Sequence, residues 1–244
     1  MRKIYFVAFT CAILLGLASC LTNDDVDNRP LMSGYFTITG SAPNYKLIAD
    51  DGTVVYPTAT SVSEISNGLG FGNHKRIYFN VKYYPENMKT ENDTLTIYNG
   101  DLVKGAYLIE MKTLSEEEAT KAGILKEDSI YPINTLSNFW VANGYLTTLF
   151  LADYSINNGI YVTSDANLYT TDIRENGVTV KMVYNRHTPT NDNTITKNEG
   201  TYAYSFDISM LNIPGNDSVT FTFETLGKQS YNYKAPRSAL NYAK

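Results

Sequence analysis

Residues 76–84, RIYFNVKYY, alternate apolar and polar side chains in the pattern of a β-strand. One side of this strand would carry Ile77, Phe79, Val81 and Tyr83. The other side would carry Arg76, Tyr78, Asn80, Lys82 and Tyr84. A period of two with one polar side is typical of an antiparallel sheet that is wet on one face and packs on a core with the other. The stretch therefore predicts an all-β fold.

The rest of the chain repeats this pattern. Three further stretches alternate in the same way, namely VTVKMVY (178–184), YAYSFDI (202–208) and VTFTFET (219–225). Asn-Gly and Asp-Gly pairs favour tight turns because these residues tolerate positive φ. The pairs are Asp51-Gly52, Asn67-Gly68, Asn99-Gly100, Asn143-Gly144, Asn158-Gly159 and Asn176-Gly177. Hairpins are expected first around Asp51-Gly52 and Asn158-Gly159.

One short helix is predicted near the middle of the chain. Ser115 and Glu118 form a capping box with an acidic first turn, and Gly123 closes the run. Residues 113–130 are also the most charged and least strand-like stretch. We therefore place a domain boundary there, with a small barrel domain over 33–115, a linker with the helix over 116–130, and an antiparallel β-sandwich over 131–244.

The N-terminus has the features of a targeting segment. Arg2 and Lys3 precede an apolar run over residues 4–17, which is too short to span a bilayer about 30 Å thick. The run ends in Leu17-Ala18-Ser19-Cys20, which resembles the lipobox of bacterial lipoproteins. That resemblance implies a signal peptide over 1–19 and a diacylglycerol attached to Cys20. The alternative is an ordinary secretory signal followed by a chance cysteine.

Cleavage before a lipidated Cys20 would determine the cysteine content and the net charge of the mature chain. Because Cys11 leaves with the signal peptide, the mature chain has no disulfide, thiolate nucleophile or cysteine metal site. The 225 residues from Cys20 onward hold 18 basic and 25 acidic side chains, a net charge of −7. An acidic chain without a basic stripe is a poor partner for nucleic acid.

Residues 20–32 are predicted to form a flexible acidic tether behind the lipid, since they are polar and without periodicity. Leu21, rather than Asp, favours the outer membrane. Asp24, Asp25 and Asp27 resemble the acidic export signals of surface lipoproteins in Bacteroidetes. We therefore expect a lipid-anchored outer-membrane protein at the cell surface, or otherwise on the periplasmic face. The alternative for the three aspartates is a merely solvated tether.

The residues available for catalysis are few. His74 and His187 stand far apart among polar residues, without the closely spaced partners of a zinc site. The acidic groups Asp50-Asp51 and Glu116–Glu118 are better explained as turn and helix-start residues than as the facing pair of a glycosidase. We expect no catalytic residue, metal or cofactor.

Aromatic side chains are the best candidates for binding. Tyr78 and Tyr84 flank Lys82 on the outward strand face, and Trp140 begins a strand after the domain boundary. Exposed aromatic rings can stack on sugars or peptides. The alternative is that these rings pack across strands within the fold.

Three positions resemble O-glycosylation acceptors of exported Bacteroidetes proteins. They are Thr94, Ser129 and Ser218, each preceded by Asp and followed by an apolar residue. A turn that leads into a strand gives the same pattern by chance.

Several longer segments resemble the NigD-like lipoproteins of Bacteroides and Prevotella over roughly residues 33–226. They are YKLIADDGTVVYP, RIYFNVKYY, NGDLVKGAYLIEMKTL, FWVANGYLTTLFLADY and TYAYSFDISML. The family has an N-terminal OB-like barrel and a C-terminal β-sandwich, which this resemblance implies here also. Its name comes from a bacteriocin gene cluster for which an immunity role was proposed. The segment RHTPTNDN departs from the family pattern, so its local geometry is not implied.

Three functions fit these observations. The first is a non-catalytic, lipid-anchored binding or accessory module of the outer membrane, with a glycan, a peptide or another envelope protein as ligand. The second is a bacteriocin immunity protein that binds a toxin. The third is a hydrolase whose distant acidic residues meet in the fold. We expect the first.

Overall fold

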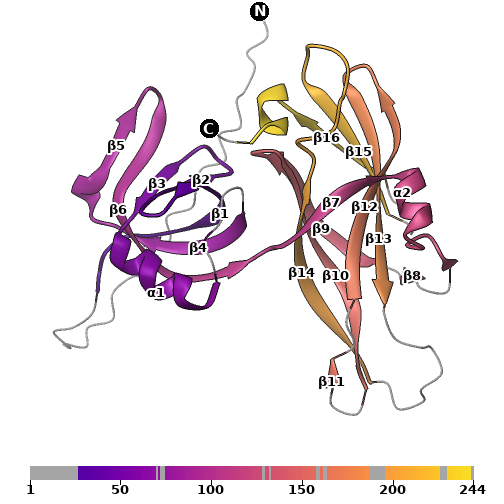
Figure 1. Cartoon of the computed structure of the whole chain (residues 1–244), viewed down its shortest axis with the longest axis horizontal. Coiled ribbons are helices and arrows are strands. Elements are labelled where there is room, and N and C mark those ends of the chain that lie inside the picture. The colour runs from indigo at the N-terminus through magenta and orange to yellow at the C-terminus, as the bar shows by residue number, and fades with distance from the viewer. Residues whose placement is uncertain are drawn as a thin grey trace, which may run out of the picture.

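The computed structural model describes residues 27–69, 71, 75–127, 130–131, 133–157, 160–161, 164–186, 196–225 and 230–242. The chain forms an all-β fold of two domains (Figure 1). A closed five-strand barrel comes first, and a nearly closed eight-strand sheet follows. The predicted fold class is therefore confirmed. The predicted signal peptide, Cys20, Asp24, Asp25, His74, His187 and Ser129 lie outside the described residues.

The barrel closes through one parallel pair. Its strands are β1 (Leu31–Ser41), β2 (Asn44–Ala49), β3 (Val54–Pro57), β4 (Arg76–Lys82) and β6 (Thr94–Tyr107). They run in the order β3-β2-β1-β4-β6, and the parallel pairing of β3 with β6 completes the circle. This is the connectivity of an OB-fold. The short η1 (Pro85–Asn87) and the strand β5 (Met88–Glu91) are inserted between β4 and β6, and β5 pairs with β6 beyond the barrel wall.

The alternation in residues 76–84 positions the barrel core as predicted. Ile77, Phe79 and Val81 are fully buried in a cluster with residues of β1, β2, β3 and β6. The polar side differs from the prediction at Arg76, which is also fully buried rather than exposed. The reason is that this end of β4 faces the second domain, as described below.

A second helix, α1 (Ala59–Leu69), was not predicted. The segment ATSVSEISNGL is rich in Ser, Thr and β-branched residues, which have modest helix propensity. Local capping and tertiary contact favour the helix instead. The Thr58 hydroxyl accepts a hydrogen bond from the backbone N–H of Ser61 at 3.3 Å, and Val62 packs against the barrel core.

The second domain has one sheet that curls into a sandwich (Figure 1). Its path is β9-β10-β14-β7-β12-β13-β15-β16, with β8 and β11 attached to β13 and β10. The first four strands of the path are β9 (Ile133–Ala142), β10 (Tyr145–Asn157), β14 (Thr196–Asp207) and β7 (Ile109–Ser115). The others are β12 (Ser164–Arg174), β13 (Gly177–Arg186), β15 (Val219–Thr225), β16 (Ser230–Ala235), β8 (Ile130–Tyr131) and β11 (Ile160–Tyr161).

The sheet is mixed rather than purely antiparallel, because β7 lies parallel to both β12 and β14 and β13 lies parallel to β15. The prediction placed residues up to 115 in the first domain. By its pairing, β7 belongs to the second sheet, so the chain passes between the domains at Leu108. The predicted helix follows as α2 (Glu116–Lys121), with the capping box of Ser115 and Glu118 formed.

The predicted turns divide into two groups. Gly52, Asn143-Gly144 and Asn176 have positive φ and turn the hairpins β2–β3, β9–β10 and β12–β13. Asn67-Gly68 instead lies inside α1, and Asn99-Gly100 inside β6. Asn158-Gly159 lies outside the described residues, although Asn157 and Ile160 on either side pair across β10 and β11.

A buried ion pair joins the two domains. Arg76 of β4 donates to both carboxylate oxygens of Asp50, in the β2–β3 turn, at 2.7 and 2.6 Å. The same guanidinium donates to Thr147 of β10 at 3.1 Å and lies 3.5 Å from the hydroxyl of Ser205 of β14. Arg76 is fully buried and Asp50 nearly so, so the charges depend on each other for solvation.

The β9–β10 hairpin extends this joint. The side-chain amide of Asn143 lies 3.3–3.4 Å from the carbonyls of Ile48 and Ala49 and from the Asp50 carboxylate. The hairpin is in turn held by the segment that follows β16, which includes η3 (Arg237–Leu240). The backbone N–H of Gly144 donates to the Ala239 carbonyl at 2.8 Å, and the ring of Tyr242 packs on Tyr145.

We expect Arg76→Met to lower the free energy of unfolding by about 3–5 kcal/mol, because it leaves the Asp50 carboxylate buried without its cation. Equilibrium urea unfolding, followed by circular dichroism, measures this change. The matched control is Arg174→Met, which breaks the exposed pair of Arg174 with Asp172 and should cost no more than about 1 kcal/mol. Equal losses in the two variants would contradict the assignment of Arg76 as the joint.

Candidate functional site

Two of the predicted binding residues lie at the domain joint. The ring of Tyr35, on β1, packs at 5.1 Å from that of Tyr78 and at 5.0 Å from that of Trp140. The indole N–H of Trp140 donates to Asp50 at 2.6 Å. Tyr78 and Trp140 are thus brought together through Tyr35 and are half-buried. Their rings contact the fold itself, which is the alternative that the sequence left open, and a binding role for them stays a prediction.

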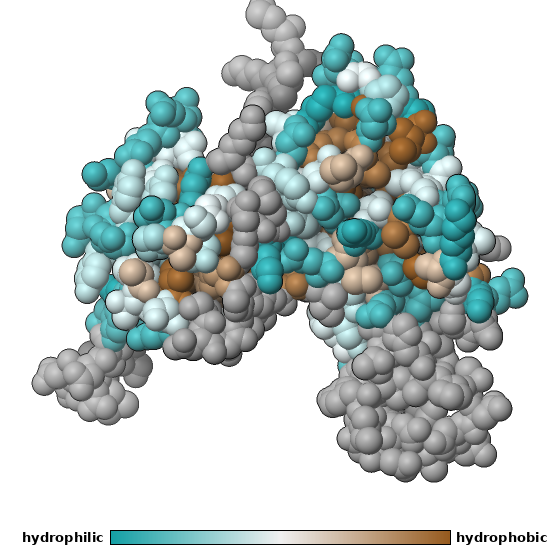
Figure 2. Space-filling model, in the orientation of Figure 1, coloured by the Kyte–Doolittle hydropathy of each residue, from teal (hydrophilic) through white to brown (hydrophobic). Residues whose placement is uncertain are grey.

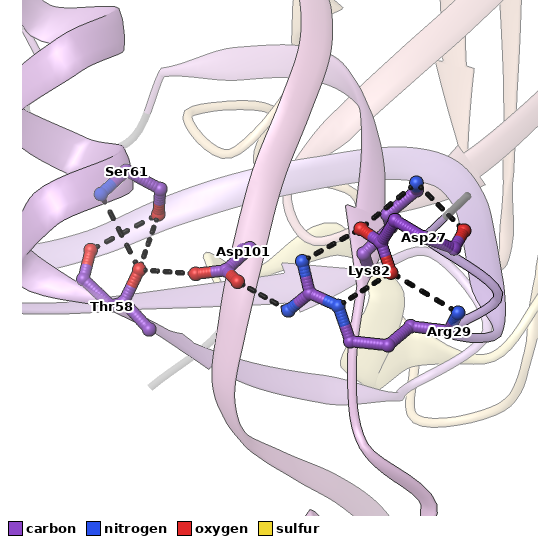
Figure 3. A network of polar contacts seen from close by, with 6 residues as sticks. All are labelled: Asp27, Arg29, Thr58, Ser61, Lys82 and Asp101. Carbon is purple, nitrogen blue, oxygen red and sulfur yellow. Dashed lines mark hydrogen bonds and ion pairs between the residues drawn. The ribbon is translucent and has the colours of Figure 1, made fainter. Parts of the chain in front are cut away.

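The other two predicted binding residues hold the beginning of the described chain (Figure 3). The Lys82 ammonium donates to the Asp27 carboxylate at 3.0 Å. The guanidinium of Arg29 pairs with Asp27 at 2.9 Å and with Asp101 of β6, and it lies 5.0 Å from the centroid of the Tyr84 ring. We call Asp27, Arg29, Lys82 and Asp101 the tether clamp. Residues 27–29, predicted as part of a flexible tether, are therefore attached to the barrel, and β1 begins at Leu31.

The clamp also reaches α1. The Thr58 hydroxyl donates to Asp101 at 2.7 Å while it caps the helix (Figure 3). The bonds from Arg29 and, to a lesser extent, Thr58 hold the pKa of Asp101 below its ordinary value of 3.8. Arg29 and then Lys82 hold the pKa of Asp27 well below that value. Both carboxylates therefore stay charged through the neutral and mildly acidic range, and the clamp persists there.

A hairpin lies at one end of the barrel, where β5 pairs with the first residues of β6. We call residues 88–98 the β5 arm. All four residues of β5 are exposed, and Asn92 and Asp93 turn the hairpin with positive φ. Among the described residues β5 pairs only with β6, so its outer edge is open. Figure 2 shows hydrophilic residues over much of the visible face of both domains.

A partly exposed aromatic stack joins the arm to β3, and it was not predicted from the sequence. Tyr56 of β3 and Tyr98 of β6 are paired residues, with ring centroids 5.2 Å apart and planes within 7°. Lys89 lies over Tyr98 at 5.6 Å, and the Tyr98 hydroxyl donates to Glu91 at 2.9 Å. Tyr56 is 39% exposed. The parallel pairing of β3 with β6, which creates this stack, is not visible in the local pattern.

Two of the predicted glycosylation sites are described, and each lies at the beginning of a strand or directly before one. Thr94 begins β6 directly after the arm's turn, and it is half-buried. Ser218 precedes β15 and is also half-buried. Modification at these positions stays a prediction.

Within the described residues, no group of three or more His, Cys, Asp and Glu side chains is placed to hold a metal ion. None of the described helices is long and apolar enough to cross a membrane. Asp50, one of the acidic residues considered for catalysis, accepts hydrogen bonds from Arg76 and Trp140. Glu117 and Glu118 bind Lys121 and Ser115 of their own helix region.

The comparisons with known proteins find matches among solved structures. A protein from Parabacteroides distasonis, provisionally named as toxin-related, matches with a TM-score of 0.56 and 16% identity over 86% of this chain and 96% of that chain. A provisionally named lipoprotein from Bacteroides fragilis matches with a TM-score of 0.52 and 11% identity, over 88% and 100%. This chain and these two proteins share the two-domain fold.

A NigD-like immunity protein from Bacteroides caccae also matches, with a TM-score of 0.49 and 12% identity over 85% of this chain and 94% of that chain. No protein-family model and no curated protein matches the sequence. Identities of 16% and 11% to the first two structures establish the fold alone.

We expect the carboxyl carbon of Asp101, followed by NMR during acid titration, to report a pKa below the ordinary 3.8. A carboxylate with a lowered pKa contributes stability above its unfolded-state pKa, and this is lost as the pH falls through the folded-state value. Arg29→Gln should move the pKa of Asp101 back toward 3.8, whereas Arg174→Gln should leave it unchanged. An Asp101 that titrates at or above 3.8 in the unaltered protein would contradict the clamp.

Proposed function

We propose that the protein is a non-catalytic, lipid-anchored envelope protein whose barrel binds a ligand through the β5 arm and the Tyr56–Tyr98 stack. The observation that carries the proposal is the open edge of β5 next to an aromatic pair in which Tyr56 is exposed and Tyr98 is half-buried. Aromatic rings supply large contact areas at little entropic cost, and an open strand edge offers backbone donors and acceptors. This combination favours a peptide segment of another envelope protein as ligand.

The lipid anchor and the location belong to the same proposal. The resemblance of residues 17–20 to a lipobox supports attachment through Cys20 in the outer membrane, and the acidic tether favours the cell surface. A bacteriocin is one protein ligand that such an arm would bind, and this is the immunity role that the NigD-like resemblance suggests. The acidic charge and the absence of a basic stripe in the sequence disfavour nucleic acid.

The charges around the arm refine the expected ligand. Lys89 lies over the ring of Tyr98 and Glu91 accepts from its hydroxyl, so a cation and an anion, both on β5, lie beside the stack. A neutral sugar would use the rings alone, whereas a peptide would use the rings, both charges and the strand edge. A glycan is therefore the second expectation.

We expect Tyr56→Ser with Tyr98→Ser to weaken ligand binding at least about 30-fold, the loss of a binding hot spot of about 2 kcal/mol. The unaltered protein and the variant are immobilised and compared for capture of envelope proteins from the same cells, and for binding to a glycan array. Met210→Ser is the matched control because Met210 is 88% exposed on the second domain. Tyr78→Ala with Tyr84→Ala tests the residues predicted from the sequence.

Two results would contradict this proposal. One is a ligand whose binding survives the paired serine variant but is lost on changes in the second domain. The other is hydrolysis of a glycan or peptide by the purified protein, which would favour the enzyme alternative.

A further inference from the structure

We propose that the end of the barrel around the tether clamp rests on the lipid surface, and that the clamp sets which side of the molecule faces the membrane. This inference rests on the lipid anchor at Cys20 proposed above. It adds an interaction surface that the anchor alone does not define, because a flexible anchor allows any face of the protein to approach the bilayer.

The first argument is the reach of the chain. An extended chain spans at most about 3.6 Å per residue, so the seven steps from Cys20 to Asp27 cover about 25 Å at most. With no clamp the chain would be free as far as Leu31, and eleven steps would cover about 40 Å. A domain of about 75 residues is roughly 30 Å across. The free tether would thus be longer than the barrel is wide, while the clamped tether is shorter.

The second argument is the chemistry of the surface around the clamp. Leu31, Val103 and Tyr84 are 55%, 51% and 49% exposed. Leu31 pairs with Lys82 across β1 and β4, and Lys82 pairs with Asp101 across β4 and β6. Val103 therefore lies on β6, the strand that carries Asp101, while Leu31 lies on β1 beside Lys82, and Tyr84 contacts Arg29 directly.

Such side chains suit a membrane interface. Aliphatic groups bury their surface among the lipid headgroups, and a tyrosine places its ring there with the hydroxyl in water. Six of the eight large apolar side chains that are exposed in the described part of the chain belong to the barrel, and only Ile173 and Met210 belong to the second domain.

The third argument is electrostatic. The mature chain has a net charge of −7, so most of its surface would be repelled by anionic lipids. In the clamp, however, Arg29 and Lys82 offset Asp27 and Asp101 through direct ion pairs. The four clamp residues together therefore carry no net charge, and an area without net charge approaches a lipid surface at a smaller cost than an acidic one.

The test uses the full lipidated protein, purified from membranes and placed in vesicles of phosphatidylethanolamine and phosphatidylglycerol. Because Cys20 carries the lipid and Cys11 is removed, an introduced cysteine is the single free thiol. A donor dye is placed by Glu86→Cys, in η1 next to Tyr84, or by Glu117→Cys on α2, which lies in the second domain, away from the barrel (Figure 1). Energy transfer to an acceptor lipid reports the distance of each dye from the bilayer.

We expect several-fold more transfer from position 86 than from position 117. Arg29→Gln with Lys82→Gln should reduce this difference by at least half, since the tether is then free to Leu31. Arg174→Gln, at an exposed ion pair of the second domain, should leave it unchanged. Salt at about 1 M should act in the same direction as the clamp variant but to a smaller extent, because ion pairs that are only partly exposed are screened incompletely. Equal transfer from both positions, or more from position 117, would overturn the orientation while leaving the anchor intact.

A second pair of variants tests the apolar area itself. Leu31→Ser with Val103→Ser should lower the transfer from position 86, with little effect on stability because both side chains are exposed. Ile173→Ser with Met210→Ser is the matched control and should have no effect. A change caused only by the control pair would overturn the proposed surface. The intact mass of the purified protein decides the anchor separately, and a mass without the lipid would overturn the anchor and the orientation together.

Discussion

The two-domain arrangement depends on one buried interaction, the ion pair of Arg76 with Asp50. Neither charge is stable in a buried place without the other, and the desolvation cost is repaid only by close, multiple hydrogen bonds. The structure supplies them from both sides of the joint, through Thr37 of the barrel at 3.0 Å and Thr147 of the second domain at 3.1 Å. The pair therefore does more than fill space. It requires the second domain to lie in one position, because only that position offers the guanidinium its remaining acceptors.

A fixed joint matters for the proposed function because the tether clamp and the β5 arm are parts of the barrel that do not take part in the joint. The tether clamp and the β5 arm both use β6, which contributes Asp101 to one and Tyr98 to the other. The strand thus connects the proposed attachment to the membrane with the surface proposed for ligand binding. If the clamp sets the orientation of the barrel, it sets the direction in which the arm points as well.

The sequence predicts the secondary-structure elements of this fold better than it predicts the contacts between them. The alternation in residues 76–84 correctly gives the core face, since burial repeats every second residue. It fails at Arg76, because the partner of that residue is 26 positions earlier and its acceptors in the second domain are more than 70 positions later. The Tyr56–Tyr98 stack is missed for the same reason, as it requires the parallel pairing of β3 with β6. Helix α1 is missed because its residues favour a helix only when Thr58 caps it and Val62 packs against the barrel core.

The hold of residues 237–242 on the β9–β10 hairpin has a consequence for the order in which the molecule is assembled. A chain that is synthesised from its N-terminus delivers the barrel first and the hairpin somewhat past the middle. The backbone group that fixes Gly144, the Ala239 carbonyl, emerges roughly a hundred residues after the hairpin. Because that hairpin contacts Ile48 and Ala49 of the barrel, the two domains reach their final arrangement only after this late segment has arrived. The barrel can thus form early, whereas the joint between the domains forms only after residues 237–242 have been synthesised.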